Sequence, residues 1–239
     1  MRLRSILGLL LMLALPYAVG AQTGEAEARE AVRRGNEHHA AGRYEAAIRE
    51  YRRVGDLEGD AYAQALYNIG VCYYELWRTE EAVGMYRRAV EAKGGRYPRA
   101  SYALGVALKD LGRTREAREA FGRSLADSGG REALASYMLG LLAMNEGNDR
   151  AAEGHFREAV ARTERRLPAA HNNLGVVLAR AGRLREAERE FEQAVKKSDG
   201  RFEEAAHNLS VCRALQRSET ARAQLATFKT VETAESVRK

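Results

Sequence analysis

The stretch NNLGVVLARAGR, residues 172–183, reads as the middle of an amphipathic helix that contains a glycine at Gly175. Glycine in a helix interior costs about 1 kcal/mol relative to alanine, so its presence needs a reason. The reason lies in the spacing, because the same residue recurs every 35 positions along the chain. The series is Gly35, Gly70, Gly105, Gly140, Gly175 and Ser210. A period of about 20–50 residues is typical of a helical repeat protein.

Four further positions keep this period relative to the repeat glycine. The residue before it is apolar in Ile69, Leu104, Leu139, Leu174 and Leu209. Twelve residues after it stands an alanine: Ala47, Ala82, Ala117, Ala152 and Ala187. Sixteen residues after it stands an aromatic residue: Tyr51, Tyr86, Phe121, Phe156 and Phe191. Seven residues after it stands a second glycine, at Gly42, Gly112, Gly147 and Gly182, with Trp77 in its place in the second repeat.

Each repeat divides at the second glycine into two helical segments. In the fifth repeat, Leu174, Val177 and Leu178 have helical spacing, and Leu184, Ala187 and Phe191 continue it after Gly182. A glycine between two helices supplies the left-handed residue that often ends the first. We therefore expect a helical hairpin in each repeat. The repeat glycine and the alanine are small, which lets the two helices approach closely, and the aromatic residue fills the space beside them.

This pattern resembles the tetratricopeptide repeat (TPR) family over about residues 28–217. The resemblance implies an all-α, right-handed superhelical solenoid of five helix-turn-helix units plus a C-terminal capping helix. Pro98 and Pro168 fit the first turns of helices. Arg34 and His38 replace apolar residues in the first repeat, which suits an exposed end. Trp77 forms either a small surface feature or a cover for the neighbouring hairpin.

The period also sets the expected boundaries. A short lead, residues 22–27, precedes five repeats at residues 28–62, 63–97, 98–132, 133–167 and 168–202. Residues 203–228 are expected to form a degenerate sixth unit, or capping helix, because a terminal repeat must hide the apolar face that its missing neighbour would bury. Residues 229–239 lack apolar periodicity and are expected to form a mobile tail.

The N-terminal residues predict export. MRLR is followed by the apolar run 5–15 and by small residues at Val19 and Ala21, the pattern of a secretory signal peptide over residues 1–21. The apolar run is shorter than the roughly 20 residues that a membrane span needs. We expect cleavage after Ala21 and a periplasmic or secreted protein of the bacterial-type cell envelope. An uncleaved anchor is the alternative.

The charges and the reactive side chains argue against catalysis and nucleic-acid binding. Loss of Arg2 and Arg4 with the signal peptide lowers the net charge from +6 to +4, and the remaining charges are interleaved along helices. The sequence shows no dense basic stripe, no cofactor loop and no metal-ligand spacing. We therefore predict no catalytic residues, no metal and no cofactor. Cys72 and Cys212 hold equivalent positions four repeats apart, too far to form a disulfide, and are expected to be small core residues.

The candidate binding site is a column of residues on the first helix of each repeat. Offsets of −3, +1 and +4 from the repeat glycine share one helix face, and offset −2 lies at its edge. The resemblance implies that this face lines the concave groove of the superhelix. In repeats two to four it comprises Tyr67, Asn68, Val71, Tyr74, Tyr102, Val106, Tyr137, Met138, Leu141 and Met144. Towards the C-terminus it continues with the polar residues Asn172, Asn173, His207 and Asn208.

Two interpretations of this column stay open at the level of sequence. The tyrosines either anchor a partner, as tyrosine often does at interfaces, or pack between neighbouring first helices. Asparagine can bind a peptide main chain as both donor and acceptor. A family variant that clamps a C-terminal carboxylate is matched only in part, by Asn36, Asn68 and Arg99, because Val32 and Ala103 stand where basic residues are needed.

These observations favour a non-enzymatic scaffold or adaptor that binds a peptide or helix of an envelope partner in the groove. The alternative is a transporter-accessory protein that holds a small apolar ligand in the same groove. A third possibility, an enzyme subunit, has no residue set in its favour.

Overall fold

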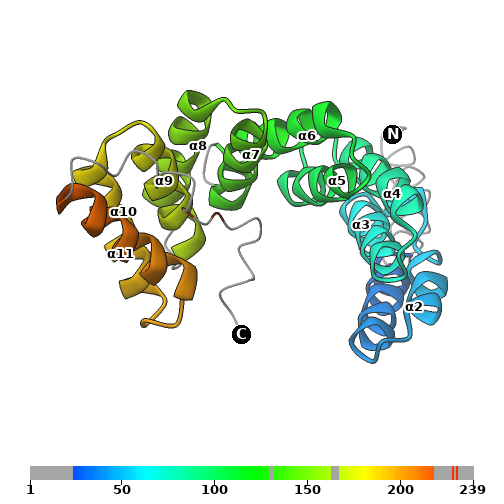
Figure 1. Cartoon of the computed structure of the whole chain (residues 1–239). Coiled ribbons are helices and arrows are strands. Elements are labelled where there is room, and N and C mark those ends of the chain that lie inside the picture. Colours follow the sequence, from blue (N-terminus) through cyan, green and yellow to red (C-terminus); the bar gives the residue numbers. More distant parts are fainter. Residues whose placement is uncertain (1–23, 130–131, 163–166, 218–227, 229, 231–239) are drawn as a thin grey trace, which may run out of the picture. The chain divides into compact units, whose positions relative to one another are not determined.

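A computed structural model of the chain describes residues 24–129, 132–162, 167–217, 228 and 230. All regular secondary structure in these ranges is helical, which confirms the predicted all-α repeat fold (Figure 1). In this part of the chain, no helix combines the length and the apolar character that crossing a membrane requires. The predicted signal peptide, residues 1–21, lies outside the described residues, as does nearly all of the predicted tail.

The chain forms two compact units, Met1–Arg113 and Thr114–Lys239. The N-terminal unit begins with helical residues 24–40 and continues with α2 (Tyr44–Tyr51), the 3-10 helix η1 (Asp56–Glu58), α3 (Asp60–Glu75), α4 (Thr79–Ala92) and α5 (Pro98–Asp110). The C-terminal unit contains α6 (Thr114–Asp127), α7 (Ala133–Asn145), α8 (Asp149–Arg162), α9 (Pro168–Arg180), α10 (Leu184–Lys197) and α11 (Glu203–Arg217).

The repeat glycine is explained by a ring that packs directly against it. A Cβ atom added at Gly70 would lie 2.6 Å from Cε1 of Tyr86. The same distance, 2.6 Å, separates a Cβ at Gly175 from Cε1 of Phe191. Real Cβ contacts this short do not occur, so any larger residue would push the two helices of the hairpin apart. The cost of a mid-helix glycine is thus offset by the close packing that it permits.

The turn between the two helices of a repeat has the same backbone conformation in both units. Gly42 and Gly112 in the N-terminal unit have φ angles of 69° and 72°, and Gly147 and Gly182 in the C-terminal unit have 74° and 76°. Trp77 takes up the same left-handed conformation, with a φ of 59°, although it is not glycine. The following amide donates to a carbonyl five residues earlier, as in Arg78 N–H to Tyr73 O at 2.9 Å, which closes the first helix.

The Trp77 side chain is 91% exposed. It therefore does not cover the neighbouring hairpin, and the expectation of a surface feature is the correct one. Pro98 and Pro168 lie in the first turns of α5 and α9, as predicted. Their missing amide hydrogens cost nothing there, because the first amides of a helix have no partner within it.

Successive hairpins stack through helices that are neighbours in sequence. In the N-terminal unit α4 packs against α5, and in the C-terminal unit α8 packs against α9 and α10 against α11. The terminal helix α11 also contacts α9, so it covers the last complete hairpin. Between repeats two and three, Leu66, Ala89, Val90 and Ala100 form a buried cluster. A stack of this kind is held together by contacts between adjacent repeats.

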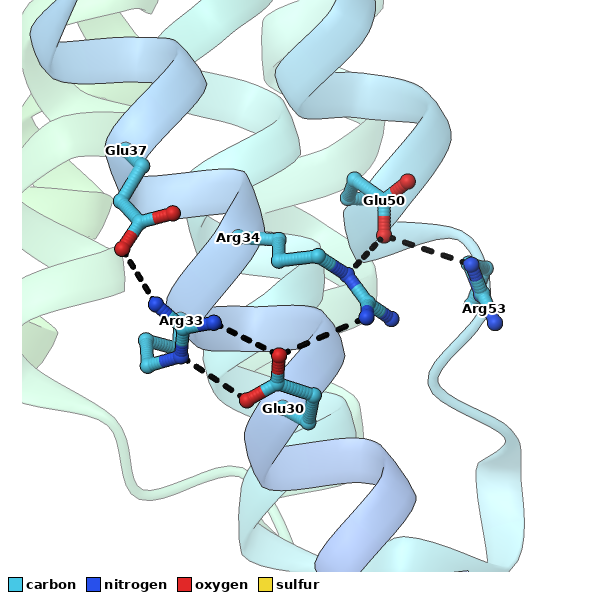
Figure 2. A network of polar contacts seen from close by, with 6 residues as sticks. All are labelled: Glu30, Arg33, Arg34, Glu37, Glu50 and Arg53. Carbon is cyan, nitrogen blue, oxygen red and sulfur yellow. Dashed lines mark hydrogen bonds and ion pairs between the residues drawn. The ribbon is translucent and has the colours of Figure 1, made fainter.

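The first repeat exposes an ion-pair network where later repeats have apolar residues (Figure 2). Arg34 occupies the position of the usual leucine, and its Nε lies 2.9 Å from Oε2 of Glu50 on α2. Glu30 pairs with Arg33 at 2.7 Å and with Arg34 at 3.4 Å. The hydrogen bond from Arg33 lowers the pKa of Glu30 below its usual value. Such partly exposed pairs contribute little stability each.

Candidate functional site

The candidate site is the face formed by the first helices of the repeats, at offsets −3, −2, +1 and +4 from the repeat glycine. We name it the first-helix face. In the N-terminal unit it lies on α3 and α5, and in the C-terminal unit on α7 and α9, with α11 continuing it. The structure gives the exposure of every residue that the sequence analysis placed there. Their role in binding stays a prediction.

On α3 the first-helix face is partly open. Tyr67, Asn68, Val71 and Tyr74 are all partly exposed. The ring of Tyr67 lies 5.8 Å from that of Tyr86, so one side of it packs on its own hairpin. Tyr67 thus has the contacts of a packing tyrosine, and because it is partly exposed, a binding role stays a prediction.

Tyr67 also contacts the start of the next repeat. Its ring centroid lies 5.8 Å from that of Tyr97, and the guanidinium of Arg99 lies over the ring at 5.4 Å. The stacking with tyrosine and the cation–π contact hold the ring in place. The Tyr67 side chain therefore has little conformational freedom.

Polar bonds along the first-helix face join successive first helices. In the N-terminal unit, Asn68 donates from Nδ2 to Oδ1 of Asn36 at 3.3 Å, and the Tyr74 hydroxyl donates to Asp110. The first bond joins α3 to the helical residues 24–40, and the second joins α3 to α5. Asn36 and Asn68 are thus engaged with each other. Tyr102 and Val106 on α5 are partly exposed.

In the C-terminal unit the same face is buried. On α7 the exposed fractions are 0% for Tyr137, 7% for Met138, 4% for Leu141 and 8% for Met144. On α9 and α11 the residues Asn172, Asn173 and Asn208 are all 0% exposed, whereas His207 is exposed.

The buried amides form a chain that ends on the tyrosine hydroxyl. Asn208 Nδ2 donates to Asn172 Oδ1 at 2.8 Å, and Asn172 Nδ2 donates to Asn173 Oδ1 at 3.2 Å. Asn173 Nδ2 then donates to the Tyr137 hydroxyl at 3.3 Å. The chain connects α11, α9 and α7. Buried amides need such partners, because an unpaired one would cost about 1–3 kcal/mol.

One residue at this site was missed by the sequence analysis. Phe228, which was placed at the end of the capping segment, stacks on Phe191 of α10 with ring centroids 5.7 Å apart and planes 18° apart. The signal in the sequence was a phenylalanine in an otherwise polar C-terminal stretch. Its position could not be read from periodicity, because Phe228 falls outside the repeat pattern.

Burial holds the two cysteine thiols of the repeats in their neutral forms. Burial raises the pKa of the Cys72 thiol to about 12, and it also raises the pKa of Cys212. Both cysteines are buried and free of disulfides. A reactive cysteine needs a lowered pKa and access to solvent, so neither has the properties of a nucleophile. Among the described residues, no group of three or more potential ligands could hold a metal ion.

A pocket of about 340 Å³ lies in the N-terminal unit, away from the first-helix face. Its apolar wall includes Leu66, Ile69 and Met85, and its rim carries Arg52 and Arg88. The pocket is thus formed by α3, α4 and the segment around η1. Its volume lies at the low end of the range for small-ligand sites.

Comparison with known families identifies the repeat. Models of the tetratricopeptide repeat match residues 25–100 and 102–166, and a further model of this repeat matches residues 168–201. The chain belongs to the tetratricopeptide repeat family. The matches cover the repeats that the 35-residue period defines.

Several solved structures share this fold. PilF of Pseudomonas aeruginosa is 18% identical, with a TM-score of 0.64 over 86% of this chain and 98% of that one. MamA of Desulfovibrio magneticus RS-1 is 19% identical, with a TM-score of 0.60 over 74% of this chain and 97% of that one. YrrB, described as a TPR protein with an unusual peptide-binding site, is 22% identical, with a TM-score of 0.57 over 74% and 86%. The search of curated proteins gave no match.

Proposed function

We propose that this protein is a non-enzymatic scaffold that binds a peptide or helix of a partner protein on its first-helix face. The single observation that carries the proposal is the state of α3, where an aromatic and polar surface is partly exposed yet already ordered by its neighbours. The structural likeness to a peptide-binding TPR protein supports the same class of function.

The chemistry of α3 suits an extended or helical peptide. Tyr67 and Tyr74 offer ring faces and hydroxyl groups, and Val71 offers an apolar contact between them. Interfaces draw much of their binding energy from a few such aromatic anchors surrounded by weaker contacts. Because the tyrosines are held by Arg99 and Asp110, binding would cost little side-chain entropy.

The test is a peptide-binding titration with matched variants of α3. Peptides selected from a random library against the purified protein serve as probes. Tyr67→Ala should weaken their binding by about 1–3 kcal/mol, which is roughly 5- to 150-fold in Kd. Tyr62→Ala is the control, because Tyr62 lies on α3 outside the first-helix face and bonds to Arg88 at 2.8 Å. Equal effects of the two variants would argue that the face binds nothing.

We also propose that the protein is exported and works in the cell envelope. The proposal rests on residues 1–21, which have the basic start, the short apolar run and the small residues of a signal peptide. N-terminal sequencing of the protein from its native source should give Gln22 as the first residue. An intact Met1 in the membrane fraction would instead favour an anchor. Cross-linking in the native envelope would then identify the partner.

The second candidate function is the binding of a small apolar ligand. The observation in its favour is the 340 Å³ pocket beside α3 and α4, which differs in place from the groove that the sequence analysis proposed. Native mass spectrometry of the freshly isolated protein would detect a bound small molecule. Loss of that species in a Leu66→Trp variant, which fills the pocket, would support this function over the scaffold.

A further inference from the structure

Every repeat has an aromatic residue at the same position of its second helix, sixteen residues after the repeat glycine. In repeats two and four its neighbour is the tyrosine at offset −3 on the first helix. The ring centroids of Tyr67 and Tyr86 lie 5.8 Å apart, and those of Tyr137 and Phe156 also lie 5.8 Å apart. The pair of rings is therefore a repeated feature of the first-helix face in both units.

Repeat five departs from this pattern because its residue at offset −3 is Asn172. Phe191 keeps its place against Gly175, but the first helix offers it an amide instead of a ring. Phe228 supplies the ring. Its centroid lies 5.7 Å from that of Phe191, almost the distance found in the other hairpins. A residue from beyond the last helix thus takes the place of a tyrosine of the repeat.

The length of chain between α11 and Phe228 permits this contact within one molecule. Phe228 follows Arg217, the last residue of α11, by eleven residues. An extended segment of that length reaches up to about 36–40 Å. Since α11 packs directly on α10, the distance back to Phe191 is well within reach.

Burial of the first-helix face provides an independent observation. On α3 all four residues of the face are partly exposed. At the same offsets on α9, Asn172 and Asn173 are 0% exposed, Val176 is 2% exposed and Ala179 is 0% exposed. Asn172 and Asn173 bond to Asn208 of α11 and to Tyr137 of α7, so the neighbouring first helices cover this face. The contact of Phe228 lies with the ring of Phe191 on α10, the second helix of the same hairpin.

We propose that the chain is its own ligand in this hairpin: Phe228 docks on Phe191 in cis and takes the place beside that ring which a first-helix tyrosine takes in repeats two and four. A partner that binds there must displace Phe228, and it should present a phenylalanine in the same slot. The inference rests on the proposed function in one respect, namely that the first-helix face can hold a peptide. It adds the chemical class of that peptide and a competitor built into the protein.

The experiment measures competition between the tethered and the free segment. The probe is a fluorescent peptide with the sequence of residues 222–236, added to the full-length protein. Wild type should bind it weakly, because the tethered copy is present at a high effective concentration. Phe228→Ala should bind it at least about tenfold more tightly, as expected if no more than a tenth of wild-type molecules have a free face. Thr230→Ala is the matched control and should behave as wild type, since Thr230 is exposed.

The outcomes separate this inference from the proposed function. If wild type, Phe228→Ala and Thr230→Ala bind the probe alike, or none binds it, the cis contact is wrong, whereas binding of library peptides at Tyr67 would leave the proposed function intact. If Phe228→Ala gains affinity for the probe but no library peptide binds at Tyr67, the cis contact is supported and the proposed function is not. A probe with alanine in place of phenylalanine should lose its binding to Phe228→Ala.

A photo-cross-link checks that the contact is within one chain. The photoreactive analogue p-benzoylphenylalanine at position 228 should attach to α10, residues 184–197, in a product with the mass of one chain. A product that contains two chains only would overturn the cis assignment and indicate exchange between copies.

Discussion

The first-helix faces of repeats two and five use the same backbone positions for different purposes. On α3 the face is tyrosine-rich and partly exposed, and its polar groups bond to neighbouring first helices at the edge. On α9 the face is amide-rich, fully buried, and joined to α7 and α11 through a continuous chain of hydrogen bonds. The same repeat positions are thus partly exposed in the N-terminal unit and buried in the C-terminal unit. Position in the repeat does not by itself decide whether a residue is core or surface.

The largest expected difference between the two faces concerns their tyrosines. Tyr137→Ala should lower the free energy of unfolding by about 3–5 kcal/mol, because it empties a fully buried site and removes the hydroxyl to which Asn173 donates. Tyr67→Ala should cost less than half as much, since Tyr67 is already partly exposed. Chemical denaturation followed by far-UV circular dichroism measures both.

Phe156→Ala serves as the core reference for that comparison, because its ring is buried against Gly140. Tyr137→Ala should resemble it. Should Tyr67→Ala prove as costly as Phe156→Ala, the column on α3 would be structural, and binding would have to be sought on another surface.

A smaller difference should emerge at alkaline pH, because the aromatic residue of the hairpin is tyrosine in repeats one and two and phenylalanine in repeats three to five. Burial raises the pKa of Tyr51 to about 12 and raises that of Tyr86 as well. The unfolded chain releases these protons from about pH 10. The contribution of these two tyrosines to the free energy of unfolding is therefore fully present below pH 10 and falls as the pH rises towards 12. Linkage gives a loss of about 1 kcal/mol at pH 11 for each such group.

The variant Tyr86→Phe tests this prediction by giving repeat two the residue of repeat four. Its loss of stability between pH 8 and pH 11, measured by urea unfolding, should be smaller than that of wild type. At pH 8 both residues are neutral, so the comparison there corrects for packing. An unchanged loss would mean that the Tyr86 hydroxyl reaches solvent in the folded protein.

The smallest expected effect lies in the turns. Trp77→Gly should stabilise the protein by about 0.5–1 kcal/mol, because it removes the cost of the left-handed conformation and loses no packing. Gly147→Ala, at the equivalent turn of the C-terminal unit, should destabilise by a similar amount. Thermal unfolding of the two variants measures the signs. Destabilisation by Trp77→Gly would show that the indole makes contacts that matter for folding.

The fold was predictable from the sequence because every repeat carries the same types of residue at the same positions. Gly175, Ala187 and Phe191 recur at fixed offsets, and small or aromatic residues at those offsets suffice to specify a close hairpin. The turn conformation was likewise predictable from Gly182. Trp77 shows the limit of prediction from the repeat pattern. Its left-handed φ angle followed from its position in the repeat, but its exposure did not, because exposure depends on the residues that surround the turn.

The site was only partly predictable, for a physical reason. Periodicity correctly placed Tyr67 and Asn172 at the same offset of their first helices, but it carries no information about what covers them. Asn172 is buried through the amide chain that joins it to Asn208 and, through Asn173, to Tyr137, and the contact of Phe191 with Phe228 comes from a residue outside the pattern. The replacement of tyrosine by Asn172 was visible as a gap in the aromatic column. Its meaning required the coordinates of the ring that fills it.

Trp77 has one more consequence, for how the protein can be observed. It is the only tryptophan in the chain, and its indole is almost fully in solvent in the folded state. The wavelength of its fluorescence emission will therefore change little when the protein unfolds. A denaturation curve recorded by tryptophan emission would show only a small signal change for the transition. The same property makes the indole a natural reporter of docking. A partner that settles over the turn between α3 and α4 would shift the emission to the blue without any attached dye.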